Sequence, residues 1–199
     1  MVACRTFVDL LLEKHQDSEL AELVRREMKR IDDMISRMLK HSSTAPGKRT
    51  SLHVHEVLEE ALRLLGPQFA DKSLTVERSF AAAPDVLEGD EHQLQQAFMN
   101  LLLNACEAAP SEGKLKAETH SAPGRDGSSV GVYVSITDNG EGIPQEILPR
   151  LFQPFFTTKP DGTGLGLAVT QRIVKEHGGT ITAESQPGQG ASFRVFLPA

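Results

Sequence analysis

Residues 90–109, DEHQLQQAFMNLLLNACEAA, have the apolar spacing of a long helix and carry two asparagines in a leucine-rich stretch. Asn100 and Asn104 are four positions apart, so they share one face of that helix. Asparagine is a poor helix former, and a buried amide without a hydrogen-bond partner costs about 1–3 kcal/mol. Either these amides pack against a sheet with their hydrogen bonds satisfied, or they line a cleft where an amide oxygen can bind Mg²⁺.

A second stretch, DGTGLGLAVTQRIVKEHGG at residues 161–179, places three glycines directly before an amphipathic helix. Glycine lets backbone N–H groups approach a phosphate, and a helix N-terminus offers unpaired donors with partial positive charge. Gly162, Gly164 and Gly166 therefore predict an anion site. The stretch is not a dinucleotide fingerprint, because Leu167 stands where the last glycine belongs, and the sequence has no GxxxxGK[ST] loop.

The stretch ITDNGEGIP, residues 136–144, begins in a predicted strand and places a carboxylate at the end of that strand. Asp138 is an acceptor-only group, so it can receive an exocyclic N–H donor such as the one that adenine presents. Gly140 and Gly142 would let a flat base approach the backbone. Taken alone, DNGEG is equally consistent with an ordinary β-turn.

Three phenylalanines lie in a predicted connection, LFQPFFTTKPDGTG at residues 151–164. Aromatic side chains in a connection indicate either a lid that packs transiently or a loop that its aromatics pin to the core. Lys159 could reach a phosphate from this segment, although most lysines lie in solvent.

The remaining pattern predicts further helices and strands. Helices are predicted over residues 53–66, 90–109 and 164–177. Strands are predicted over residues 74–80, 85–90, 113–120, 129–138, 179–185 and 191–198, with a polar hairpin loop at 121–128. The irregular alternation predicts an α+β fold, a two-layer α/β sandwich in which helices cover one face of a mixed sheet.

The composition favours a cytoplasmic protein with a sizeable core. Its 199 residues carry a net charge of −6, which argues against the basic face that nucleic-acid binding needs. No apolar run approaches the ~20 residues of a membrane span. Two cysteines, Cys4 and Cys106, are too few for a disulfide framework or a cysteine zinc site. We therefore expect both to behave as small apolar residues in a reducing compartment.

Residues 1–45 are predicted to form a partial helical hairpin whose first helix is truncated. Within a predicted helix over 19–41, a 4-3-4-3 apolar spacing typical of coiled coils is formed by Val24, Met28, Ile31, Ile35 and Met38. We expect this stripe to make the hairpin dimerise; an ordinary amphipathic helix on a globular core is the alternative. Residues 42–50, SSTAPGKRT, are expected to link the hairpin to a globular domain over 50–199.

The order and spacing of these motifs resemble the ATP-binding domain of bacterial sensor histidine kinases, in the wider family of gyrase B, Hsp90 and MutL. The N box matches at Asn100-LLL-Asn104-A, and the first glycine box matches at Asp138-x-Gly140-x-Gly142. The F box matches at Phe152-QP-Phe155-Phe156-TTK, and the second glycine box matches at Gly162-T-Gly164-L-Gly166-L. The resemblance covers roughly residues 50–199 and implies the Bergerat-type mixed sheet with helices on one face.

The resemblance also implies an ATP site with Mg²⁺. Asp138 would accept the adenine amino group, Asn104 would hold Mg²⁺ bridging the phosphates, and residues 145–163 would be the ATP lid. Asn100 and Lys159 are the candidate catalytic residues, and because Asn100 replaces the Glu base of the hydrolytic relatives, fast ATP hydrolysis is not expected. The residues expected to contact the nucleotide are Asn100, Asn104, Asp138, Gly140, Gly142, Ile143, Phe152, Thr158, Lys159, Gly162, Thr163, Gly164, Leu165, Gly166 and Leu167.

A histidine kinase also needs an acceptor histidine, which the family places on the first hairpin helix in a motif like H-E-x-x-[NT]-P-L. None of the 7 histidines has that context, so we expect the motif to fall just before Met1 and the chain to bind Mg-ATP but phosphorylate itself poorly. The resemblance implies two partners, a response regulator receiver domain and a second copy bound through the hairpin. Alternative functions are a nucleotide-gated regulatory module, an anti-sigma-like serine kinase of the same superfamily, or an ATPase of the gyrase or MutL kind.

Overall fold

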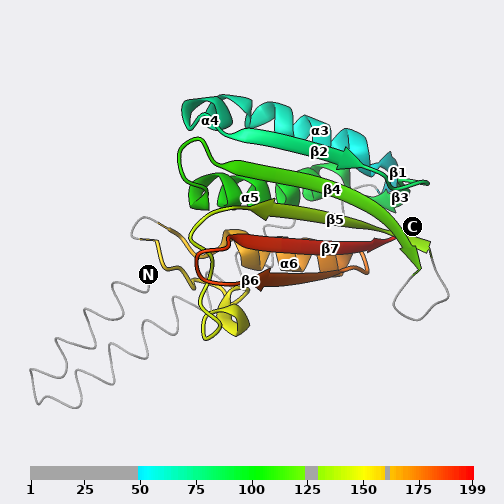
Figure 1. The fold of residues 1–199 in the computed structure, drawn as a ribbon. Helices are drawn as coiled ribbons and strands as arrows, with labels where there is room; N and C mark the ends of the chain where they lie inside the picture. The colour runs from blue at the N-terminus through cyan, green and yellow to red at the C-terminus, as the bar shows by residue number, and fades with distance from the viewer. Residues whose placement is uncertain (1–48, 124–129, 160–161) are drawn as a thin grey trace, which may run out of the picture. The chain divides into compact units, whose positions relative to one another are not determined.

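The computed structural model describes residues 49–123, 130–159 and 162–199 (Figure 1). The predictions that lie outside the described residues are the hairpin at 1–45, most of the linker at 42–50 and most of the loop at 121–128.

The chain divides into two compact units, and each is described by itself. The sheet and all the helices below lie within Lys48–Gln153 and Gly166–Ala199. The segment Pro154–Leu165 belongs to the other unit.

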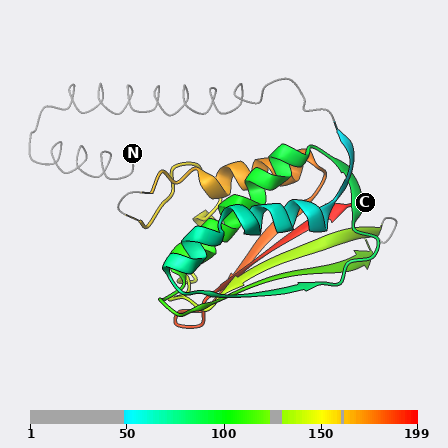
Figure 2. The same cartoon turned by 90° about the horizontal axis from the view of Figure 1, so that it is seen from above.

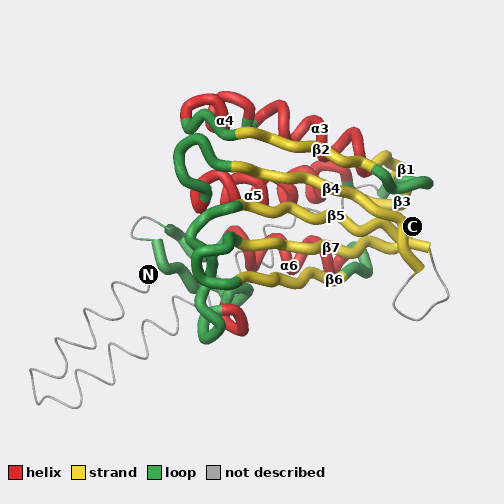
Figure 3. Tube along the Cα trace, in the orientation of Figure 1, coloured by secondary structure: helices red, strands yellow, loops and turns green. Residues whose placement is uncertain are grey.

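A five-stranded mixed sheet forms one layer, as predicted (Figures 1 and 3). Its strands, in spatial order, are β2 (Thr75–Phe80), β4 (Lys114–Pro123), β5 (Val130–Asp138), β7 (Ala191–Pro198) and β6 (Thr180–Ser185). Strands β2 and β4 are parallel and the other neighbours are antiparallel. Strand β5 alternates its side chains between two faces, so Val132, Val134 and Ile136 enter the core while Tyr133, Ser135 and Thr137 lie on the opposite face.

Helices α3 (Val54–Leu64), α5 (Glu91–Ala108) and α6 (Gly166–Glu176) form the second layer, on one face of the sheet (Figure 2). The core lies between the layers, with Phe98, Leu101 and Ile136 fully buried in it. This arrangement confirms the predicted two-layer α+β fold. Within the described ranges, no helix combines the length and the apolar character needed to cross a bilayer.

Local signals in the sequence explain the limits of α5. Its N-cap is Asp90, whose carboxylate accepts a hydrogen bond from the Gln93 N–H at 3.1 Å. The helix ends at Ala108 because Pro110 disfavours helical geometry at Ala109, which is extended. Cys106 on this helix is buried without a disulfide, and burial raises the pKa of its thiol.

Three elements were not predicted, of which the shortest is the 3-10 helix η1 (Leu148–Arg150). Strand β1 (Thr50–His53) pairs antiparallel with β3 (Val86–Gly89), where the sequence suggested the end of a linker and the start of a helix. A second short helix, α4 (Gly66–Asp71), follows the predicted stop at Gly66 because Pro67 needs no N–H partner in a first helical turn.

Helix α6 begins two residues later than predicted. Gly164 has a φ of +66°, which lies outside the helical region, so the helix starts only at Gly166.

Candidate functional site

The polar face of α5 carries the two asparagines, but their side chains have different surroundings. The Asn100 amide nitrogen donates to the Gly166 carbonyl at 3.2 Å and to Thr170 Oγ1 at 3.4 Å, so it ties α5 to the first turn of α6. The Asn104 side chain is half-buried and makes no hydrogen bond within the part of the chain that the structure describes. The Asn100 amide nitrogen therefore has its hydrogen-bond partners within the protein, whereas the Asn104 amide is available to a ligand.

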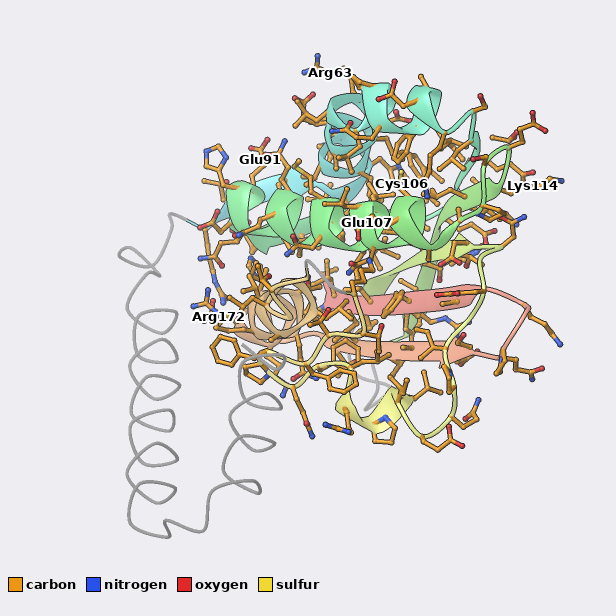
Figure 4. The ribbon with its side chains drawn as sticks, turned by 90° about the vertical axis from the view of Figure 1, so that its left-hand side faces the viewer. Arg63, Glu91, Cys106, Glu107, Lys114 and Arg172 are labelled. Carbon is orange, nitrogen blue, oxygen red and sulfur yellow. The ribbon has the colours of Figure 1, made fainter. Side chains whose placement is uncertain are left out.

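Figure 4 shows α5 and α6 side by side, with Cys106 and Glu107 toward the C-terminal end of α5 and Arg172 on α6. Leu101 and Leu102 are fully buried in the core, whereas Leu103 is 38% exposed. Because the Asn100 amide bonds to the Gly166 carbonyl, the asparagine face of α5 lies beside the start of α6.

Asp138 lies at the end of β5, where it is 4% exposed. Its Oδ1 accepts a hydrogen bond from the Gly140 N–H at 2.8 Å, which fixes the carboxylate over its own turn. Position 140 requires glycine, because a Cβ there would overlap the carbonyl oxygen of Ala108 at the end of α5. The turn is thus packed directly on the helix that carries both asparagines.

Three of the expected nucleotide contacts are apolar residues that pack against the core. Ile143, Phe152 and Leu167 are partly buried against it. Phe152 therefore follows the second interpretation of the aromatic segment, a ring that pins its connection to the core.

The segment Pro154–Leu165 folds back on itself and holds six more of the expected contacts, Thr158, Lys159, Gly162, Thr163, Gly164 and Leu165. The Phe155 N–H donates to the Gly164 carbonyl at 2.9 Å, and both residues have positive φ angles. A Cβ at Gly164 would overlap the Phe155 backbone, so glycine is required there. The Gly162 N–H donates to the Lys159 carbonyl at 3.2 Å.

Two threonine hydroxyls accept backbone hydrogen bonds within this segment. Thr157 Oγ1 accepts from the Lys159 N–H at 3.1 Å, and Thr163 Oγ1 accepts from the Leu165 N–H at 3.4 Å. Thr158 and Thr163 are exposed.

Two residues that the sequence did not single out hold α6 in place. Thr170 is fully buried, and its hydroxyl donates to the Gly166 carbonyl at 2.9 Å while facing the Asn100 amide. His177 is buried and joins the end of α6 to the start of α5, because its Nε2 accepts from the Asp90 N–H at 2.9 Å. Its Nδ1 donates to the Ile173 carbonyl at 2.8 Å. For Thr170, the sequence offered one signal, because a threonine four positions after Gly166 can bond back to its carbonyl within a helix.

A polar hollow of about 510 Å³ lies beside the β6–β7 hairpin. Its lining includes Thr137, Gln145, Ser185, Gln186 and Ser192. None of the residues expected to bind nucleotide lines this hollow. The candidate site lies instead where the Asp138 turn packs on the end of α5.

The oxygen chemistry of α5 fits Mg²⁺. The described ranges contain no group of three or more His, Cys, Asp or Glu arranged to hold a metal ion. Mg²⁺ prefers oxygen ligands and usually keeps waters and substrate phosphates around it, so one amide oxygen, from Asn104, is a sufficient protein contribution.

Curated relatives match most of the chain. It is 39% identical over 188 residues to the sensor histidine kinase ZraS of Klebsiella oxytoca, an alignment that covers 94% of this chain and 38% of the relative. It is 35% identical over 190 residues to the sensory histidine kinase/phosphatase NtrB of Rhodobacter capsulatus, covering 92% of this chain and 53% of the relative. The chain therefore spans about half or less of the length of these relatives.

Solved structures share the fold. The catalytic domain of histidine kinase ThkA superposes with a TM-score of 0.64 at 30% identity, covering 75% of this chain and 95% of that domain. The mycobacterial sensor histidine kinase MprB gives a TM-score of 0.64 at 27% identity, covering 75% and 97%. ThkA in complex with the response regulator protein TrrA shares the fold with a TM-score of 0.67 at 23% identity, covering 97% and 57%.

A family model also matches the sequence, over residues 89–199. That range contains α5, the Asp138 turn and the second glycine box, and it is more than half of the chain. The chain belongs to the family of histidine kinase-, DNA gyrase B- and HSP90-like ATPases.

Proposed function

We propose that this chain is the Mg-ATP-binding catalytic portion of a two-component sensor histidine kinase. Membership of the ATPase family and the names of the relatives support this proposal. The observation that carries it is the buried Asp138 carboxylate, fixed by Gly140 on the C-terminal turn of the helix that bears Asn100 and Asn104.

Each group at this junction has a role in the proposed function. Asp138 accepts the amino group of adenine, because a buried carboxylate at a strand end is an acceptor with a fixed direction. Asn104 offers its amide oxygen to Mg²⁺, which neutralises phosphate charge when bound. Asn100 braces the α6 N-terminus, whose N–H groups suit phosphate, and is also a candidate catalytic contact.

Residues 145–163 are proposed as the lid over the phosphates. Lys159 supplies positive charge to the γ-phosphate, and Gly162 and Gly164 supply backbone N–H groups without side-chain obstruction. Thr158, Thr163 and Leu165 are the remaining proposed contacts in and next to the lid.

The proposed reaction moves the γ-phosphoryl group of ATP to an imidazole nitrogen. A nitrogen–phosphorus bond forms as the bond to the β–γ bridging oxygen breaks, which leaves ADP. The acceptor would be a histidine on a longer or partner chain, and a response regulator receiver domain would take the phosphoryl group next. We also propose a cytoplasmic location and dimerisation through residues 1–45.

Labelled phosphate transfer tests this function. The purified chain is incubated with γ-labelled ATP and Mg²⁺, with and without a separate histidine-bearing dimerisation hairpin from a ZraS-type relative. We expect acid-labile phosphate on the added hairpin, little on the chain itself, and none with an Asp138→Ala variant. Acid-stable phosphate on a serine would favour an anti-sigma-like kinase, and steady release of inorganic phosphate would favour a hydrolytic ATPase; either contradicts the proposal.

A further inference from the structure

The hairpin between β6 and β7 is packed against the Asp138 turn, although the residues that meet are 42 to 52 positions apart in sequence. Gly190 has a φ of +77°, and a Cβ there would overlap the carbonyl oxygen of Asp138. Gly142 has a φ of +73°, and a Cβ there would overlap the carbonyl oxygen of Gln186. Such close backbone approach at two points means that the hairpin and the turn form one structural piece.

Ser185, the last residue of β6, joins the two halves of that piece. Its hydroxyl oxygen accepts a hydrogen bond from the Ile143 N–H at 2.7 Å. The same hydroxyl donates to the Gly190 carbonyl at 2.6 Å. One hydroxyl therefore serves as acceptor for the turn and donor to the hairpin, a pairing that an alanine cannot replace.

The Asp138 turn is consequently held from two sides. Gly140 rests on the carbonyl of Ala108 at the end of α5. Ile143, at the far end of the turn, is held through Ser185. The direction of the Asp138 carboxylate depends on the backbone of this turn, because its Oδ1 is bonded to the Gly140 N–H within it.

We propose that Ser185 is a positioning residue of the nucleotide site, which sets the turn that receives the adenine base. This inference rests on the proposed function. Ser185 does not contact the nucleotide; it acts through Ile143 and Gly190 on the Asp138 turn. Replacing Ser185 should therefore change the affinity for the adenine base by the same factor whatever the number of phosphates on the ligand.

The test compares Ser185→Ala with a matched control, Ser192→Ala, by displacement of a fluorescent ATP analogue. Ser192 has a hydroxyl that pairs with Thr137 Oγ1 at 2.9 Å, so it makes no bond to the turn. We expect Ser185→Ala to weaken ATP, ADP and adenosine by the same factor of about ten, equivalent to about 1.4 kcal/mol. Ser192→Ala should leave all three affinities close to wild type.

Ser185→Thr keeps the hydroxyl and suits a strand, so it should restore most of the affinity that alanine loses. Urea unfolding of each variant shows that the comparison is made on folded protein. Wild-type affinity in Ser185→Ala, a loss confined to ATP, or a folded Ser185→Thr as weak as alanine would each overturn the positioning role. A wild-type chain that does not bind ATP would instead overturn the proposed function itself.

Discussion

Asn100 and Asn104 share one face of α5, yet only Asn100 is held by hydrogen bonds in the described part of the chain. The Gly166 carbonyl can only accept, so the Asn100 group that faces it is the NH₂. Asn104 has no such constraint and can turn its oxygen toward a ligand. The two residues are therefore expected to respond differently to substitution.

Replacing Asn104 with alanine should remove only the metal-dependent part of ATP binding. We expect the affinity for Mg-ATP to fall about tenfold, while the affinity for ATP in a chelator stays unchanged, because a single oxygen ligand is lost. Calorimetric titration with and without Mg²⁺ measures both values. Leu103→Ala, next along the helix and exposed, is the control; equal losses with and without metal in Asn104→Ala would contradict the metal role.

A second residue-scale feature is the ion pair between His53 and Asp85, whose Nδ1 and Oδ1 atoms are 3.0 Å apart. The hydrogen bond to Asp85, together with its negative charge, raises the pKa of His53 above 6.5. Burial tends to raise the pKa of Asp85, but the hydrogen bonds from His53 and the His55 N–H, with the histidine charges, bring it below 3.8.

These shifts give the pair a defined pH window. A raised histidine pKa stabilises the fold below pH 6.5 and loses that effect as the pH rises through the folded value. A lowered carboxyl pKa stabilises above pH 3.8 and loses that effect as the pH falls through the folded value. The pair therefore stabilises the protein most between these limits.

His53→Gln should lower the urea midpoint at about pH 5.5 and have a smaller effect at about pH 8.5, because the stabilisation by the charged imidazole is lost as the pH rises through its folded pKa. Urea unfolding at both pH values checks this, with the exposed His92→Gln as the control. A drop of the same size at both pH values would show that the charge on His53 does not matter.

At the scale of elements, α5 is held at both ends by groups from elsewhere in the chain. His177 accepts from the Asp90 N–H at its start. At its end, Lys72 Nζ donates to the carbonyls of Cys106, Glu107 and Ala109 at 2.9, 3.0 and 2.9 Å. A cation at a helix C-terminus satisfies carbonyls that the helix leaves unpaired and opposes the negative end of its dipole.

Lys72→Met keeps the aliphatic stem but removes these three hydrogen bonds. We expect a loss of about 2 kcal/mol in the free energy of unfolding, the size measured for hydrogen bonds to charged groups. Urea unfolding measures it against Lys175→Met, because the exposed Lys175 ammonium bonds, among the residues that the structure describes, only to Gln171 at 3.4 Å. Equal stabilities for the two variants would show that Lys72 does not support α5.

The elements carrying the site could be predicted because their signals are local. The leucine and asparagine spacing identified α5, and the alternation through Ile136 identified β5 with Asp138 at its end. Strand β1 could not be predicted, because its four residues gain their structure from pairing with β3 about 35 positions later.

The same limit applies to the supporting residues. Lys72 and Cys106 are 34 positions apart, and Asp90 and His177 are 87 apart. Nothing in the sequence singled out Ser185 at the end of its strand, because its partner Ile143 lies 42 positions away. Motif spacing identified the groups expected to face the nucleotide, whereas tertiary structure was needed to find the groups that hold them.

At the scale of the whole molecule, the Asp138 turn is a point where the helical layer contacts the end of the sheet. The turn continues directly from β5, Ala108 at the end of α5 contacts it at Gly140, and Gly190 of the β6–β7 hairpin contacts it at the Asp138 carbonyl. A stretch of backbone fixed by three elements can present one carboxylate in a constant direction. This makes Asp138 the residue on which selectivity for adenine should depend.

The most direct test of this claim is calorimetric titration of wild type and Asp138→Asn with ATP, GTP and Mg²⁺. The asparagine keeps an oxygen for the Gly140 N–H but replaces the charged acceptor with an amide. We predict that wild type binds ATP in preference to GTP, whose guanine presents an acceptor at the corresponding position. We also predict that Asp138→Asn binds ATP at least about tenfold more weakly, while Thr137→Ala, on the opposite face of β5, does not. Equal ATP affinity in wild type and Asp138→Asn, or no binding by the folded wild type, would contradict the account.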